Sequence, residues 1–165
     1  MQTVTVAVAD VDRERRAVYE RLLHGEDGIT LLSNVGISNG ERNDHAFVNR
    51  RVRQRTDILA YENEVARIKR LQPLVMLVNL DLTEDEGHAL LLSLRSECPE
   101  VRIVLLTDES VQEGKIIQAL EIGACGYISG EMIEVHLLKA VQMVGRGEAW
   151  VPRRMLGNIM DRVLN

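Results

Sequence analysis

The segment from Pro73 to Leu82 reads Pro-Leu-Val-Met-Leu-Val-Asn-Leu-Asp-Leu, a short apolar run that ends in polar side chains. A run of this length and composition is typical of a strand that is buried on both faces of a parallel sheet. In open parallel sheets the functional crevice lies beyond the carboxyl ends of the strands, so Asn79 is predicted to lie near it. An aspartate there would be a nucleophile towards a phosphoryl donor, whereas an uncharged asparagine amide is not.

Segments with the features of strands and of helices alternate along the chain. Apolar runs predict strands at Thr3–Ala9, Ile29–Val35, Leu74–Leu80, Val101–Leu106 and Gly126–Ile128. Helical spacing of apolar residues predicts helices at Arg13–His24, about Leu59–Leu71, Glu86–Glu97, Val111–Ile122 and Ile133–Val144. Because alternation with short connections builds a parallel sheet between helices, we expect an α/β fold of three layers, doubly wound.

The same spacing predicts which helical side chains face the sheet. In the first helix these are Ala17, Val18, Leu22 and Leu23. In the helix Ile133–Val144 they are Val135, Leu138, Val141 and either Met143 or Val144.

One more helix is expected at the end of the chain, from about Arg153 to Leu164. Its apolar residues form one stripe, made of Met155, Leu156, Ile159, Met160, Val163 and Leu164. A stripe of this kind needs a partner. Packing against its own domain and pairing with another chain are both compatible with the pattern.

The composition limits the class of protein. A chain of 165 residues with 45% hydrophobic residues is large enough for one well-packed domain. A net charge of −5 argues against non-specific nucleic-acid binding, and no apolar run is long enough to span a membrane. No metal-ligand spacing is found among Cys98, Cys125 and the scattered histidines, so we expect no metal site and no cofactor. The two cysteines are expected to be reduced thiols in a cytoplasmic protein.

Four segments, in this order along the chain, resemble the receiver domain of bacterial response regulators, in particular the LuxR/NarL-type subfamily. They are Val6–Asp12, Pro73–Gly87, Cys98–Thr107 and Gly123–Gly130. The likeness spans about residues 3 to 149. It implies a flavodoxin-like sheet of five parallel strands in the order 2-1-3-4-5, to which this chain adds the C-terminal helix.

The resemblance also identifies a phosphorylation pocket, and this chain departs from it. Asp10 matches the first of two acids that bind Mg²⁺ in the family, but Val11 replaces the second. Asn79 replaces the phosphoacceptor aspartate, and Gly130 stands where the family has a lysine.

Two other pocket residues, Thr107 and Tyr127, match the family's switch hydroxyl and the aromatic residue that moves with it. Since Mg²⁺ prefers several carboxylate ligands and a phosphoryl group needs a countercharge, we expect a degenerate pocket that is not phosphorylated.

Other acids lie close to the expected strand ends. Asp12 and Asp81 are weak candidates for metal ligands. Either one of Asp12, Asp81 and Asp108 is a relocated phosphoacceptor, or all three are solvated loop acids. Exposed carboxylates are the norm, so we favour solvated acids.

Residues 36–57 form an insert between the second strand and the second helix, and the insert is longer than the usual connection. It is basic, through Arg42, Arg50, Arg51, Arg53 and Arg55. The insert is either a contact for an acidic partner or a solvated loop, and charge runs are usually solvated.

These observations predict a receiver-like domain at residues 1–149 and a linker or dimerisation helix at 150–165. The expected function is a phosphorylation-independent signalling module, the regulatory and dimerisation domain of a transcription regulator. We expect it to form a homodimer and not to bind a membrane. It would contact DNA only through a C-terminal domain absent from this chain.

The alternatives are a stand-alone adaptor for a partner protein or small ligand, or a cofactor-binding flavodoxin-like protein. The segment Asp10–Arg15 lacks the glycine-rich turn that a flavin phosphate needs. We therefore predict no catalytic residues and no enzymatic activity.

Overall fold

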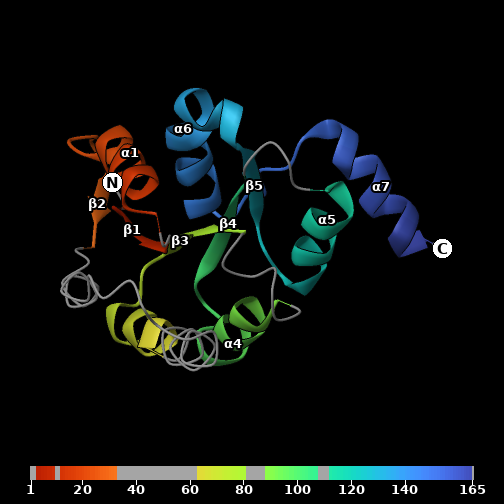
Figure 1. The fold of residues 1–165 in the computed structure, drawn as a ribbon, viewed down its shortest axis with the longest axis horizontal. Helices are drawn as coiled ribbons and strands as arrows, with labels where there is room; N and C mark the ends of the chain where they lie inside the picture. Colours follow the sequence, from red (N-terminus) through yellow and green to blue (C-terminus); the bar gives the residue numbers. More distant parts are fainter. Residues whose placement is uncertain (1–2, 10–11, 33–62, 81–87, 108–111, 165) are drawn as a thin grey trace, which may run out of the picture.

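A computed structural model describes residues 3–9, 12–32, 63–80, 88–107 and 112–164, except for the side chains of residues 162 and 163. The basic insert at residues 36–57 lies outside the described residues. Five parallel strands form the sheet: β1 (Val4–Ala9), β2 (Ile29–Leu31), β3 (Val75–Asn79), β4 (Arg102–Thr107) and β5 (Gly126–Ser129). Their order is β2-β1-β3-β4-β5, which confirms the predicted topology (Figure 1).

The helices cover both faces of the sheet, as expected for a doubly wound fold (Figure 1). They are α1 (Arg13–Leu23), a helix over residues 63–71, α4 (Ala89–Glu97), α5 (Glu113–Ile122), α6 (Ile133–Gly145) and α7 (Arg153–Leu164). The core has two halves because successive strand residues point to opposite faces. Val8 and Leu77 pack with α1 and α6, whereas Ala9 and Val78 pack with residues 63–71, α4, α5 and α7.

The inward face of α6 differs from the prediction at one position. Val135 is 69% exposed, so its assignment to the buried face was wrong. The buried residues of α6 are Ile133, Leu137, Ala140, Val141 and Val144. Two residues along a helix amount to about 200° of rotation, so Val135 points away from the face that Ile133 begins.

Helix α1 also buries a different set of side chains. Ala17 is exposed, whereas Tyr19 and Leu23 are buried against the sheet. Tyr19 lies one turn before Leu23, and both join the half of the core that β1 shares with α6. The sequence prediction gave too much weight to aliphatic residues and missed the aromatic one.

The chain after α6 returns to the edge of the sheet. The Trp150 backbone donates to the Cys125 carbonyl at 3.1 Å, and the Tyr127 N–H donates to the Trp150 carbonyl at 2.9 Å. A Cβ at Gly126 would lie 3.2 Å from the Trp150 carbonyl oxygen, so a glycine lets this segment approach β5 closely. The pairing leads directly into α7, whose Met155 is buried in the core.

Candidate functional site

The carboxyl ends of β3, β4 and β5 lie side by side, because all of these strands run in the same direction. Asn79 pairs with Leu106 across β3 and β4, and Thr107 pairs with Ser129 across β4 and β5. The Leu80 N–H continues the ladder by donating to the Leu106 carbonyl at 2.9 Å. Asn79 is 1% exposed, so its neutral amide occupies a buried position at this edge.

Thr107 and Tyr127 are in direct contact at the same edge. The Thr107 hydroxyl donates to the Tyr127 hydroxyl oxygen at 3.3 Å. Thr107 is 2% exposed and Tyr127 is 7% exposed, so the Tyr127 ring lies inside the protein. Two residues that the sequence assigned to one switch are thus brought together by adjacent strands.

Gly130 follows β5 directly and begins the short 3-10 helix η2 (Gly130–Met132). It is exposed, unlike Asn79 and Thr107. A glycine at this position brings neither a cation nor a hydrogen-bonding side chain to the strand ends.

Several predicted site residues lie outside the described residues. These are Asp10, Val11, Asp81, Asp108 and the arginines of the insert, Arg42, Arg50, Arg51, Arg53 and Arg55. Asp10 and Val11 directly follow β1 in the sequence, so their part in the pocket stays a prediction.

Asp12 has a structural role at the N-terminus of α1. Its carboxylate accepts hydrogen bonds from the backbone N–H groups of Glu14, at 2.9 Å, and Arg15, at 3.3 Å. A side-chain oxygen at this position stabilises a helix by satisfying N–H groups that have no partner within the helix. Within the described part of the chain, no three His, Cys, Asp or Glu side chains are grouped so that they could hold a metal ion.

Arg67 is a buried cation that the sequence analysis missed. It is 5% exposed and donates to the Val8 carbonyl at 3.1 Å, while its guanidinium pairs with the Glu64 carboxylate. The Val6 carbonyl, two residues earlier, accepts from the Leu32 N–H just after β2. Arg67 therefore binds a carbonyl of β1 at a position beyond the end of β2. The Glu64 carboxylate balances the charge of Arg67.

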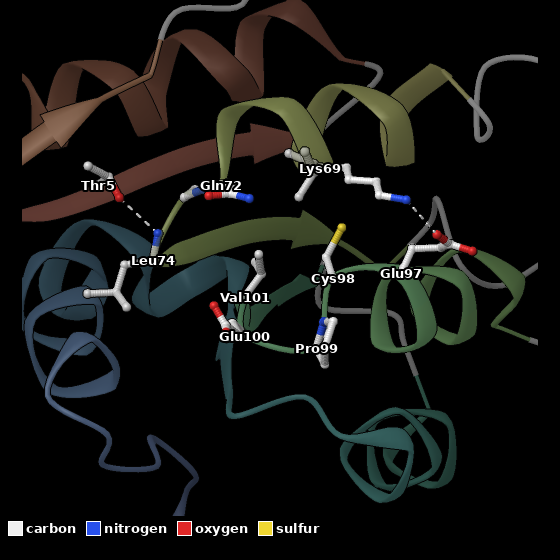
Figure 2. Close-up of a pocket in the computed structure, with 11 residues that line it drawn as sticks. Thr5, Lys69, Gln72, Leu74, Glu97, Cys98, Pro99, Glu100 and Val101 are labelled. Atoms are coloured by element: carbon white, nitrogen blue, oxygen red, sulfur yellow. Dashed lines mark hydrogen bonds and ion pairs between the residues drawn. The ribbon is translucent and has the colours of Figure 1, made fainter.

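A cleft of about 440 Å³ lies at the opposite, amino-terminal end of the strands (Figure 2). Thr5 lines it from β1, and Gln72 to Leu74 line it from the segment before β3. The loop before β4 contributes Cys98 to Val101, and a 3.1 Å ion pair between Lys69 and Glu97 lies at its side. The cleft is thus separated from Asn79 and Thr107 by the length of the sheet.

We expect Cys98 to react slowly with alkylating reagents. Burial raises the pKa of the Cys98 thiol above its ordinary value of 9.0; Lys69 lowers this pKa and Glu97 raises it. The thiol therefore stays protonated at pH 8, and the thiolate is the reactive form. Iodoacetamide should modify Cys98 more slowly than a free thiol at pH 8, with a rate that increases as the pH rises and the thiolate forms.

Mass spectrometry of tryptic peptides measures this rate separately for Cys98 and Cys125. The Cys98→Ser variant identifies which signal belongs to Cys98. A Cys98 rate equal to that of a free thiol at pH 8 would show that the thiol is not shielded.

Comparisons with known proteins agree with this architecture. No protein-family model matches the chain. The DNA-binding transcriptional activator DevR/DosR of Mycobacterium tuberculosis is 27% identical over 99 residues, which cover 60% of this chain and 45% of that protein. The isolated REC domain of RcsB from Salmonella enterica serovar Typhimurium has a TM-score of 0.68 at 13% identity, covering 98% of both chains. A LuxR-family two-component response regulator from Aurantimonas has a TM-score of 0.69 at 15% identity, covering 99% of this chain and 100% of that one.

The fold and the sequence matches define the class of protein. The chain has a receiver-type fold and is similar to the receiver domains of LuxR-family response regulators, which confirms the resemblance predicted from its four segments. The chain spans 42% to 45% of the length of the curated relatives it matches, which are named as transcriptional regulators. In the described part of the chain, no helix is both long and apolar enough to cross a membrane.

Proposed function

We propose that this chain is a phosphorylation-independent receiver-like module. The observation that carries the proposal is the buried, neutral Asn79 at the end of β3, where the family resemblance implies a phosphoacceptor. An amide cannot form the acyl phosphate that activates such a domain. Gly130 removes the countercharge, and Glu64 already balances the charge of Arg67.

The contact between Thr107 and Tyr127 supports the same proposal. It is buried and is made by the protein's own hydroxyl groups. In a conventional receiver we would expect the phosphoryl group to bias this pair of residues. With Asn79 in place of the phosphoacceptor this input is lost, so the domain would act as a constitutive platform or respond to another input.

We further propose that the module is the regulatory and dimerisation domain of a cytoplasmic transcription regulator. The matched segments cover less than half of each relative, and one of the relatives is named as a DNA-binding activator. A DNA-binding domain outside residues 1–165 would supply DNA contact, with 1–149 as the receiver-like domain and 150–165 as the connecting helix. The domain itself would have no catalytic role.

The cleft at the amino-terminal end of the strands favours one alternative input. Its volume of about 440 Å³ is within the range of small-molecule sites, which is about 300 to 1,000 Å³. A small ligand there would contact the loops before β3 and β4. A flavin is a poor candidate, because the amides of Glu14 and Arg15 at the start of α1 already bind the Asp12 carboxylate.

Incubation with radiolabelled acetyl phosphate and Mg²⁺ tests the proposal. The wild-type chain should carry no label above background, and its mass by light scattering should be unchanged by the treatment. A conventional receiver that keeps its aspartate serves as the positive control. Stable label on this chain would contradict the proposal, and mapping the label to Asp12, Asp81 or Asp108 would identify a relocated acceptor.

A further inference from the structure

The outer face of α7 is apolar and exposed. Met155 is 1% exposed and packs into the core, whereas Leu156 is 45%, Met160 is 58% and Leu164 is 76% exposed. Helix α7 lies beside α5 at one end of the molecule, with its far side turned outward (Figure 1). The Asn158 amide donates to the Glu113 carboxylate at 2.8 Å, which holds the polar flank of α7 against α5.

The three exposed side chains form one continuous ridge. Leu156, Met160 and Leu164 are spaced four residues apart, so they lie along the same side of the helix over about 12 Å. Exposed apolar residues that occur singly need no explanation, but a contiguous ridge marks an interaction surface. Of the described side chains in the stripe, Met155 is buried and Ile159 is half-buried, so the exposed ridge has room for a second partner.

Gly157 adds a second observation on the same face. A Cβ at Gly157 would have nothing within 4 Å, so no contact within the chain requires a glycine there. Glycine inside a helix costs about 1 kcal/mol relative to alanine. Gly157 lies about 20° around the helix from Leu164, and a missing side chain beside the ridge lets another helix approach closely.

The charges on α7 indicate what that other helix is. Arg153 and Arg154 are exposed in its first turn, and Asp161 is exposed near its end. Two copies of α7 packed in parallel would place the arginines against each other. Two antiparallel copies that cross near Gly157 would place Arg154 of each copy opposite Asp161 of the other, and unlike charges favour this arrangement.

We propose that α7 is a homodimerisation helix that packs antiparallel against α7 of a second copy of this chain, along the ridge Leu156, Met160 and Leu164. This inference rests on the proposed dimerisation function and names its interface. A contact between two short helices is smaller than a standard interface of about 1,600 Å². The dimer should therefore be weak, with a mass that rises with protein concentration.

Sedimentation velocity of the 165-residue chain over a range of concentrations provides the test. Met160→Lys should raise the dimer Kd by about tenfold or more, because it places a charge in the apolar contact. Val135→Lys is the matched control, since Val135 is a comparably exposed apolar residue on α6. Circular dichroism should show that both variants keep the wild-type fold.

The possible outcomes separate the interface from the function. Loss of the dimer in Met160→Lys but not in Val135→Lys supports the α7 interface. The opposite pattern overturns this interface and leaves dimerisation, through α6, in place. A wild-type chain that stays monomeric at all concentrations overturns both the interface and the proposed dimerisation role.

A charge exchange tests the antiparallel orientation. Arg154→Glu and Asp161→Lys should each raise the Kd several-fold, because each places like charges opposite one another in the dimer. The double variant should recover wild-type affinity. Residues 154 and 161 are about 10 Å apart along one helix, so a contact within one copy would not explain the recovery. Additive weakening in the double variant would overturn the antiparallel arrangement.

Discussion

Asn79→Asp is expected to destabilise the folded protein at pH 7 by about 2–4 kcal/mol. Asn79 is 1% exposed, and the change places a carboxylate in a buried position. Among the described residues, Arg67 is a buried cation, and Glu64 neutralises its charge. Gly130 supplies no charge, so position 130 does not offset the cost of burying the new carboxylate.

The destabilisation should depend on pH in a defined direction. Burial would raise the pKa of the carboxyl group introduced at position 79 above its unfolded value of about 3.9. A raised folded-state pKa contributes stability below the unfolded pKa, and this contribution is lost as pH rises through the folded pKa. The difference in unfolding free energy between Asn79→Asp and wild type should therefore shrink as pH falls from 7 towards 4.

Urea unfolding of both proteins at several pH values measures this effect. Asn79→Ala is the control, because it removes the amide without adding a charge, and its deficit should not depend on pH. If Asn79→Asp were as stable as wild type at pH 7, or if millimolar Mg²⁺ restored its unfolding free energy, a cation site would remain in the pocket.

The architecture was predictable from sequence because its main signals are local. A strand buried on both faces must be apolar along its length, and the run at Leu74–Leu80 contains β3 at Val75–Asn79. The predicted bounds of the last helix, Arg153–Leu164, are those of α7. The five-strand order came from the family resemblance and is confirmed.

The features that were missed depend on contacts between distant residues. Arg67 is buried because its guanidinium donates a hydrogen bond to the carbonyl of Val8, which lies 59 residues earlier in the chain. Residue type alone predicts that an arginine is exposed. The pairing of Trp150 with Gly126 is also non-local. Neither the apolar periodicity nor the charge pattern of the sequence predicts it.

The candidate site was predictable to the extent that strand ends determine it. Asn79 and Thr107 lie at the carboxyl ends of β3 and β4, and Tyr127 reaches Thr107 from β5. Asp12 was considered as a ligand, but its place at the start of α1 gives it the capping role.

Restoring the phosphoacceptor alone is not expected to restore phosphorylation. Asn79→Asp would supply the nucleophile, but Mg²⁺ would still lack the second acid at Val11. The phosphoryl group would still lack the cation at Gly130, and positioned positive charge supplies much of the stabilisation in phosphoryl transfer. The effect should therefore be all-or-none: no label on the single variant, and label on Val11→Asp/Asn79→Asp/Gly130→Lys.

Label uptake from acetyl phosphate by wild type, Asn79→Asp and the triple variant, with and without Mg²⁺, tests whether the pocket has lost its function. We predict background label on wild type and on Asn79→Asp. The triple variant should take up Mg²⁺-dependent label approaching one phosphoryl group per chain. Label on Asn79→Asp equal to that on the triple variant would contradict the account, because it would mean that Val11 and Gly130 leave a working pocket.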